Sequence, residues 1–351
     1  MTTKIRVLTL CLVIALLPGM FPAGAAAQSK VGTTAAQFLG IPVGARAIAM
    51  GGAYVASNQD VSSIYWNPGA VVQSGASEFA FVNTDWLVGT KFRWFGLALN
   101  LDGDNTIGAS VTDMDYGQGD VTTVASPEGT GETWSAADLA VSITYSRRLT
   151  DKFSIGGTVK YINQRVYNET ASTAAFDAGL LYVTDLNGLR IGMSMSNFGG
   201  DMTLSGRDLL NRVDTDPNNA GSNKTLVAYL KTDAWPLPLL FRVGASMDVV
   251  KNDDFTATVA VDALRPNDDF ESINLGAEVG WWNTLFVRGG YQSMFKGGQA
   301  PLSNDKGQEG LTLGAGVHYH FEGFAALSFN YAFQKFGLFG NLNTIALSIG
   351  F

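Results

Sequence analysis

The chain has 351 residues, of which 46% are hydrophobic and only 15% are charged, and it contains 41 glycines. Its formal net charge is −8, which argues against a nucleic-acid partner because binding to phosphate backbones depends on clustered basic side chains. The combination of few charges with many glycines is atypical of both a disordered acidic protein and an ordinary globular enzyme.

The first residues have the organisation of a secretory signal peptide. Lys4 and Arg6 precede an apolar run from Val7 to Leu17, and small residues with an Ala25-x-Ala27 pattern follow. The run is shorter than the roughly 20 residues that a membrane-spanning helix needs. We therefore expect cleavage after Ala27 and loss of residues 1–27, which include the chain's single cysteine.

From Gly75 onward, apolar residues alternate with small or polar ones. Between residues 311 and 321, for example, Leu311, Leu313 and Val317 share one face, while Thr312 and Gly316 share the other. This two-residue period predicts strands with one apolar face. The pattern gives about fourteen strands, at 78–88, 92–101, 104–115, 134–148, 153–167, 173–185, 189–199, 238–250, 254–264, 272–281, 284–293, 311–320, 324–334 and 342–351.

The connections between these strands alternate in length. Short ones, such as 101–104 and 251–254, are interleaved with a set that includes the long loops 116–133, 200–237 and 295–310. Bacterial outer-membrane barrels have short periplasmic turns and longer extracellular loops, and aromatic residues near strand ends, here including Trp86, Trp94 and Tyr319, are typical of their interfacial girdles. The sequence thus predicts an all-β fold: a transmembrane antiparallel barrel of about 14 strands, residues 75–351, in the lipid of the outer membrane.

The last residues support this interpretation. The segment 343–351 ends an apolar row at Phe351, which resembles the carboxy-terminal signal that the bacterial barrel-assembly machinery reads, so this machinery is an expected partner. A secreted β-rich structural or adhesive protein is the alternative that does not involve a barrel. Heat-modifiable migration and dependence on detergent would exclude it.

Several charges fall on the small or polar face of the predicted strands. They either line a channel or bind a plug, and the sequence does not separate these two possibilities; they are Lys160, Arg190, Arg242, Asp248, Asp262, Glu278 and Arg288. His318 and His320 share a face, but no third metal ligand is evident. Motifs for a catalytic nucleophile, a phosphate or a catalytic metal are absent, so we predict neither an enzyme nor a cofactor.

Residues 28–74 do not follow the strand pattern. A barrel of about 14 strands has internal space that its own side chains do not fill, so these residues are predicted to form a hatch or plug. Gly51 and Gly52 permit close backbone approach, and Asn67-Pro68-Gly69 predicts a turn into the wall. Arg46 lies in an apolar segment and needs a partner. We favour a structural lock over a ligand site, with Asp60, Asp177, Asp248, Asp262 and Glu278 as candidates.

The stretch GARAIAMGGAYVASNQDVSSIYWNPGA, residues 44–70, resembles the amino-terminal signature of the PorV/PorQ family, a branch of the FadL-like barrels. Ala49 and Ala53 match the family pattern in addition to the motif residues named in the next sentence, whereas Gly52 and Gly69 depart from it. The candidate hatch motif consists of Gly44, Arg46, Met50, Gly51, Tyr54, Asp60, Tyr65, Trp66, Asn67 and Pro68.

The resemblance implies a hatch inside a fourteen-stranded barrel. It also implies a role in type IX secretion, in which the protein receives cargo from the translocon and passes it to an attachment complex at the cell surface. The loops 116–133 and 200–237 would then be the docking surface. The alternative within the same resemblance is a FadL-like channel for hydrophobic molecules, with Phe92, Trp94 and Ala98 as possible pocket walls.

Overall fold

The computed structural model describes residues 31–351 apart from 58–59, 187, 215, 217, 220–224, 295–309 and 322–324. The predicted signal peptide, residues 1–27, therefore lies outside the described part, as does most of the predicted loop 295–310.

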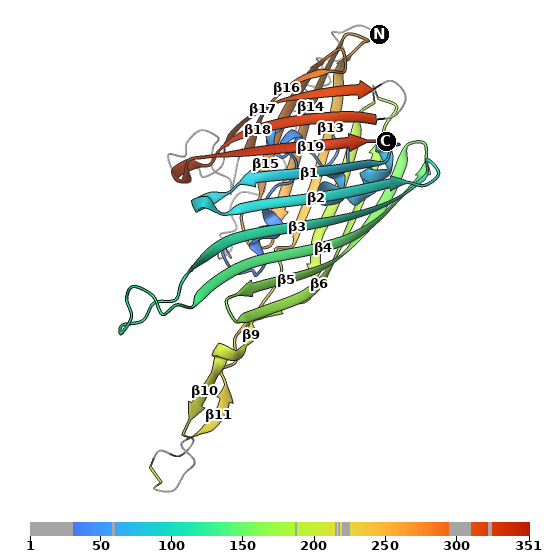
Figure 1. Cartoon of the computed structure of the whole chain (residues 1–351). Coiled ribbons are helices and arrows are strands. Elements are labelled where there is room, and N and C mark those ends of the chain that lie inside the picture. Colours follow the sequence, from blue (N-terminus) through green and yellow to red (C-terminus); the bar gives the residue numbers. More distant parts are fainter. Residues whose placement is uncertain are drawn as a thin grey trace.

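Fourteen antiparallel strands form a closed barrel (Figure 1). Each strand pairs with its neighbours, and the ring closes because β1 pairs with β19, β7 pairs with β13 and β5 pairs with β6. All fourteen predicted strands are confirmed, with small shifts at their ends. They are β1 (Glu78–Asp85), β2 (Lys91–Asn100), β3 (Asn105–Asp120), β4 (Thr133–Thr150), β5 (Phe153–Val166), β6 (Glu169–Val183), β7 (Arg190–Gly199), β13 (Leu240–Lys251), β14 (Phe255–Pro266), β15 (Ser272–Trp281), β16 (Leu285–Met294), β17 (Leu311–Phe321), β18 (Ala325–Lys335) and β19 (Asn341–Gly350).

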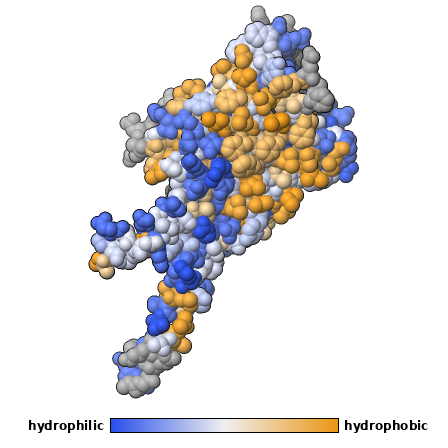
Figure 2. Space-filling view, viewed as in Figure 1, coloured by the Kyte–Doolittle hydropathy of each residue, from blue (hydrophilic) through white to orange (hydrophobic). Residues whose placement is uncertain are grey.

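The outer face of the barrel is apolar. On β17, Leu313 and Val317 point outward and are exposed, whereas Thr312 is fully buried. Figure 2 shows apolar side chains gathered over the wall that the strands form. Hydrocarbon offers no hydrogen bonds to the backbone, and the closed ladder pairs the strands with one another instead. None of the described helices is long and apolar enough to cross a membrane.

One predicted girdle residue is placed differently. Trp94 lies on the inner face of β2, with 1% of its surface exposed, beside Phe92 and Ala98. The outer face of the same strand carries Phe95 and Leu99. Because both faces of β2 are apolar near the loops, the alternation does not distinguish inside from outside there.

The N-terminal segment, residues 31–77, runs through the bore. Ala35 donates its amide to Pro236 O at the rim of the long loops, hereafter the loop rim. Ser77 O accepts the amide of Phe351 at the opposite rim, where the tight turns lie, hereafter the turn rim. Between these points lie the short helices η2 (Gln37–Gly40), α2 (Ala45–Ala49), α3 (Ser63–Trp66) and η3 (Pro68–Ser74), drawn inside the ring of strands in Figure 1.

The connection between β7 and β13 contains structure that the sequence analysis treats as loop. Its root folds over the mouth of the barrel, where β9 pairs with β6 and Leu237 is buried. Beyond the root, β10 and β11 form a hairpin that projects away from the barrel (Figure 1). The elements are β8 (Met202–Thr203), β9 (Ser205–Gly206), η5 (Arg207–Leu209), β10 (Leu210–Val213), β11 (Leu226–Tyr229) and β12 (Ala234–Trp235).

The predicted loop between β3 and β4 is shorter than expected. β3 and β4 extend to Asp120 and from Thr133, which reduces the predicted loop 116–133 to residues 121–132. Single turns of 3-10 helix, η4 (Leu87–Gly89) and η7 (Gly337–Phe339), complete the loop rim.

The path of the N-terminal segment predicts on which side of the membrane its start lies. Val31 is 57% exposed and precedes Thr34, whose hydroxyl donates to Asp268 at the loop rim. Since the turns of outer-membrane barrels face the periplasm, Val31→Cys is expected to react with a membrane-impermeant maleimide on intact cells.

Asp253→Cys, in the turn between β13 and β14, is the matched variant on the opposite rim. It should react only after the outer membrane is permeabilised. Loss of Cys11 with the signal peptide would leave no other thiol in the mature chain. The reverse labelling pattern would show that the barrel is inverted.

Candidate functional site

The site begins with Arg46, which α2 holds against the barrel wall. Its Nε lies 2.8 Å from Glu278 Oε2 and its Nη2 lies 2.7 Å from Glu278 Oε1, which makes a bidentate ion pair. Arg288, on the neighbouring strand β16, also donates to Glu278 Oε2, at 2.5 Å, and to Asn330 Oδ1, at 2.7 Å. Arg46 Nη1 is 3.8 Å from Asp60 Oδ2. Of the five candidate partners, Glu278 makes the closest contact and Asp60 a weaker one.

Burial and charge act in opposite directions on Arg46. Burial is the largest single effect and by itself lowers the pKa of the guanidinium. Attraction to Glu278, the smaller effect of Tyr54, the hydrogen bond to Glu278 and the effect of Asp60 together outweigh burial, so the pKa lies well above its ordinary value. Burial also raises the pKa of the Tyr54 phenol, which donates to Asp60 Oδ2 at 2.5 Å. At neutral pH the arginine is therefore charged and the tyrosine is a neutral donor.

Two polar side chains hold the backbone of the segment. Asp262 Oδ2, from β14, accepts the amides of Tyr54 at 2.7 Å and Val55 at 2.8 Å. Asn67 Nδ2 donates to Val55 O and to Leu180 O of β6, each at 2.9 Å. Asn67 Oδ1 also accepts the amide of Gly69, so this residue caps η3, which begins at Pro68. These bonds satisfy backbone groups that leave regular structure at the turn.

The aromatic pair of the motif, Tyr65 and Trp66, packs under Arg242. The guanidinium of Arg242 lies 5.1 Å from the ring centre of Trp66 and 5.3 Å from that of Tyr65. Trp66 Nε1 donates to Val43 O at 2.8 Å, and the Tyr65 hydroxyl donates to Leu39 O at 3.2 Å. Burial raises the pKa of Tyr65. Both rings thus join Arg242 of β13 to backbone carbonyls of the segment.

Glycines on the inner face of the wall meet the backbone of the segment. A Cβ at Gly290 would lie 2.2 Å from Gly51 N, and one at Gly276 would lie 2.4 Å from Met50 O. On the other side of the barrel, Gly69 makes the same kind of contact, with Gly179 O only 2.4 Å from its own hypothetical Cβ. The alternation in the sequence shows that small residues point inward but does not show that a second backbone lies against them. The departure from the family pattern at Gly69 thereby has a steric reason.

The other motif glycines have conformational roles. Gly44 and Gly51 adopt φ values of +92° and +67°, which favour glycine over residues with a Cβ. Met50 is fully buried and packs with Tyr54 and Trp66.

The predicted inward charges divide into two groups. Arg242, Asp262 and Glu278 contact the N-terminal segment, and Arg288 reaches it through Glu278. Lys160 instead pairs with Asp177 at 2.8 Å, and Arg190 with Asp248 at 2.8 Å, so these pairs belong to the wall itself. Phe351 is exposed at the turn rim.

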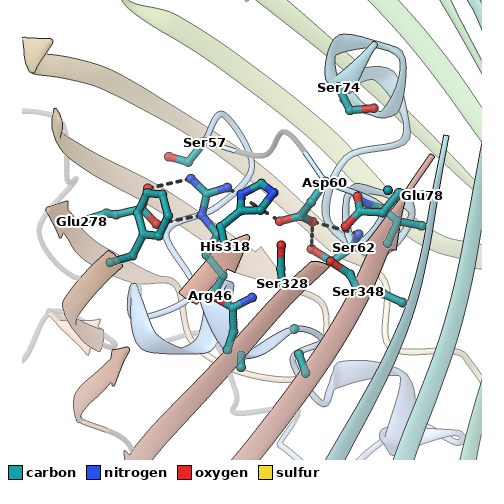
Figure 3. Close-up of a pocket in the computed structure, with 18 of the residues that line it drawn as sticks. Arg46, Ser57, Asp60, Ser62, Ser74, Glu78, Glu278, His318, Ser328 and Ser348 are labelled. Atoms are coloured by element: carbon teal, nitrogen blue, oxygen red, sulfur yellow. Dashed lines mark hydrogen bonds and ion pairs between the residues drawn. The ribbon is translucent and has the colours of Figure 1, made fainter. Parts of the chain in front are cut away.

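A cavity of about 540 Å³ lies between the N-terminal segment and the turn rim. Figure 3 shows part of its lining. The lining combines apolar side chains with the charged or titratable ones of Arg46, Asp60, Glu78, Glu278, His318 and His320. The two histidine rings stack with their centres 4.4 Å apart. Within the described residues, no group of three His, Cys, Asp or Glu side chains is placed to hold a metal ion.

The loop side of the bore is packed instead. Phe38, Leu39 and Ile41 of the segment join Phe92, Trp94 and Ala98 in one apolar cluster. A second cavity beside this cluster has a volume of only about 30 Å³. The side chains proposed as walls of an apolar pocket are therefore in contact with the N-terminal segment.

Comparison with known proteins identifies the family to which this barrel belongs. The family model for the type IX secretion system protein PorV matches residues 24–205, more than half of the chain. The chain belongs to the PorV family. This confirms the family seen in the motif, and together with the closed barrel it locates the protein in the outer membrane. No curated protein sequence matches the chain.

Solved structures share the fold at low sequence identity. The CymD monoaromatic hydrocarbon channel is 15% identical with a TM-score of 0.53, covering 88% of this chain and 96% of its own. The toluene transporter TbuX of Ralstonia pickettii is 12% identical with a TM-score of 0.51, covering 88% and 97%. The toluene transporter TodX of Pseudomonas putida is 14% identical with a TM-score of 0.51, also covering 88% and 97%. At these identities, the likeness shows the barrel fold alone.

The close glycine contacts of this PorV-family barrel make a specific prediction. Gly290→Ala places a methyl group against the backbone of Met50 and Gly51, and neither backbone is free to move away. We expect the free energy of unfolding to fall by about 1–3 kcal/mol, as for other overpacked sites. Urea unfolding in detergent micelles, together with protease cleavage within residues 31–77, measures the effect.

Gly289→Ala is the control on the same strand. Gly289 faces the opposite side, and the nearest atom to its hypothetical Cβ is Leu313 Cδ2 at 3.7 Å. This variant should unfold and digest like the wild type. Equal effects from the two variants would contradict a contact that is specific to the inner face.

The buried charge cluster makes a second prediction. Glu278→Gln keeps the shape of the side chain but leaves Arg46 and Arg288 without their shared carboxylate. Breaking a buried pair from one side costs about 3–5 kcal/mol, and we expect a loss of that size in the urea unfolding experiment.

Asp113→Asn is the comparison for an exposed pair. Asp113 lies 2.7 Å from Arg93, and the side chains are 32% and 39% exposed. Its loss should cost about 0–1 kcal/mol. A Glu278→Gln effect no larger than that of Asp113→Asn would show that Arg46 is not locked by charge.

Proposed function

We propose that this PorV-family barrel is a docking protein of type IX secretion, which receives secreted cargo at the outer membrane and passes it to an attachment complex. Residues 28–74 act as a hatch that stays in place, inside a barrel formed by residues 75–351 after loss of residues 1–27. Family membership supports a role in secretion. The observation that carries the docking role is the filled bore.

The bore is occupied by packed side chains and backbone rather than by a flexible loop. Val43, Ala45, Ala49, Met50 and Tyr54 have no exposed surface. Displacing them would expose apolar surface, separate Arg46 from Glu278 and free the amides held by Asp262. Each of these steps has a free-energy cost of a few kcal/mol or more. A protein that keeps this plug acts through its surfaces.

The loop rim offers such a surface. The β10–β11 hairpin carries Leu210, Val227 and Tyr229, which are 41%, 60% and 70% exposed. Apolar residues are visible along this hairpin in Figure 2. Two-stranded hairpins are marginally stable in water, and exposed apolar side chains next to open strand edges are typical of protein–protein contact. We place cargo binding on this hairpin and on the neighbouring hairpin at residues 116–133.

Other partners follow from the barrel itself. The apolar wall contacts outer-membrane lipid, and we propose that the barrel-assembly machinery reads the strand that ends at Phe351. The translocon and the attachment complex are the further partners that the proposal requires. Neither a catalytic group nor a cofactor is part of it.

Uptake of hydrophobic small molecules is the second candidate. It draws on solved relatives whose titles describe hydrocarbon channels and toluene transport, at identities of 15% or less. The larger cavity of this chain carries charged side chains and lies toward the turn rim, whereas the apolar side chains on the loop side are packed together. The docking function therefore fits the described bore better.

The hairpin provides the test of the docking function. Replacing Leu210, Val227 and Tyr229 with serine should leave the barrel folded, because these side chains are exposed on the projecting hairpin, but should reduce cargo capture strongly. The measurement is the recovery, with affinity-purified barrel from cell envelopes, of secreted proteins that share a carboxy-terminal domain. Heat-modifiable migration on gels checks folding.

Val88→Ser is the control at the loop rim, since Val88 is 94% exposed in η4 and lies outside both hairpins. Undiminished capture by the triple variant would remove the hairpin from the proposal. Hydrocarbons or fatty acids in the purified barrel, with no cargo protein, would favour the channel instead.

A further inference from the structure

The cavity at the turn rim is lined by four carboxylates, three arginines, one lysine and two histidines. Among these, Arg190 and Asp248 pair with each other, and Lys251 is exposed. Asp60, Glu78 and Glu278 face the cavity together with Arg46 and Arg288. Both arginines bond to Glu278 within 2.8 Å, and Arg46 reaches Asp60 only at 3.8 Å. Apart from the Arg190–Asp248 pair and the exposed Lys251, two guanidinium groups thus lie near three carboxylates. Glu78 is held by uncharged donors, the amide of Val61 and the hydroxyl of Ser348.

We propose that this cavity binds a cationic side chain, an ammonium or guanidinium group, of a peptide that arrives from the turn rim, and that Asp60 and Glu78 hold the cation. The inference concerns the rim opposite to the cargo surface and does not depend on the docking function proposed above.

The two carboxylates are held close together by consecutive residues of the segment. Ser62 donates its amide to Asp60 Oδ1 at 2.9 Å, and Val61 donates its amide to Glu78 Oε2 at 2.8 Å. Figure 3 shows Asp60 and Glu78 on either side of Ser62, with both side chains reaching the cavity. Two carboxylates that face the same cavity repel each other when both are charged, and a cation between them removes the repulsion. Charge-assisted hydrogen bonds to an ammonium or a guanidinium are correspondingly strong.

A buried hydroxyl in the same cavity also has room for a ligand group. Ser57 lines the cavity but is only 4% exposed, and its Oγ has no hydrogen-bond partner among the described residues. A buried polar atom without a partner is costly, so native structures pair nearly all of them. Ser57 and Arg46 line the same cavity, and both are labelled in Figure 3. A peptide N–H or C=O next to the bound cation would satisfy this hydroxyl.

The dimensions of the cavity select an organic cation over a metal ion. Its volume of about 540 Å³ falls in the range of about 300–1,000 Å³ that holds small organic ligands. The described residues place no group of three metal-ligating side chains together. The exposed lining residues Lys251, Asn283 and His320 lie at the turn rim, and the apolar cluster closes the other side. The ligand therefore enters from the turn rim and stops at the plug.

Isothermal titration calorimetry on the purified barrel in detergent micelles tests the proposal. The probes are the capped tripeptides Gly-Lys-Gly and Gly-Arg-Gly, with capped Gly-Gln-Gly as the neutral match. We expect at least one cationic peptide to bind about tenfold more tightly than the glutamine peptide, from a charged hydrogen bond of the usual strength. Glu78→Gln should remove most of that difference while retaining an acceptor for Val61.

Asp253→Asn is the matched control, because it removes one carboxylate from the same rim outside the cavity lining. It should bind like the wild type. Equal binding of charged and neutral peptides, no binding of either cationic peptide, or an equal loss in Glu78→Gln and Asp253→Asn would each overturn the proposal. So would calcium binding that depends on Glu78 when neither cationic peptide binds.

A measurement on the wild type covers the case in which Glu78→Gln does not fold. A ligand that binds the folded state raises its unfolding temperature. The preferred cationic peptide should raise the unfolding temperature of the wild type, and the glutamine peptide should not. Equal shifts, or no shift with either, would contradict the cation site.

Discussion

Two arginines from different parts of the chain converge on one carboxylate, and the interior of this barrel depends on that convergence. Glu278 is 5% exposed, Arg46 comes from the N-terminal segment, and Arg288 comes from the adjacent strand. Buried ion pairs add little net stability compared with apolar contacts, but an unpaired buried charge is very unfavourable. The cluster therefore specifies where the segment must lie: Arg46 satisfies its charge only when α2 sits at the height of Glu278.

The glycines of the wall favour the same position of the N-terminal segment, because its backbone packs against them there. Glycine weakens a strand and is retained where another backbone approaches closely. Gly276 and Gly290 lie under Met50 and Gly51, while Gly156 and Gly179 lie under Pro68 and Gly69. Closure of the hydrogen-bonded ring compensates for the weaker strands, because no edge is left open. Charge and steric fit thus specify one register for the segment, and the aromatic pair beneath Arg242 adds a third contact.

The sequence predicts the barrel well because the outer and inner faces of the wall have different surroundings. Lipid outside and packed polar groups inside produce a period of two, which identified all fourteen strands. The prediction was wrong for Trp94, where both faces of β2 are apolar. The β10–β11 hairpin was missed because its strands have four residues each, too few for the alternation to show.

The interior contacts are harder to predict because they join residues far apart in the chain. Arg46 and Glu278 are separated by 232 positions, and which of five carboxylates meets the arginine depends on the stagger of every intervening strand. The sequence analysis named both residues but not the pair. The inward glycines were visible as small residues, yet glycine also marks turns, so composition alone does not show that a second backbone lies against them.

The bore is not uniform along its length, and this asymmetry assigns different tasks to its two ends. On the loop side, apolar side chains of the segment and the wall exclude solvent, so the chemistry offered to the outside lies on the projecting hairpin and the loops. On the turn side, the same segment forms one wall of a cavity that carries charged side chains. One stretch of chain thereby packs against the wall at the loop side and borders the cavity at the turn side. Ion pairs, backbone hydrogen bonds and close glycine packing hold this stretch between the two rims.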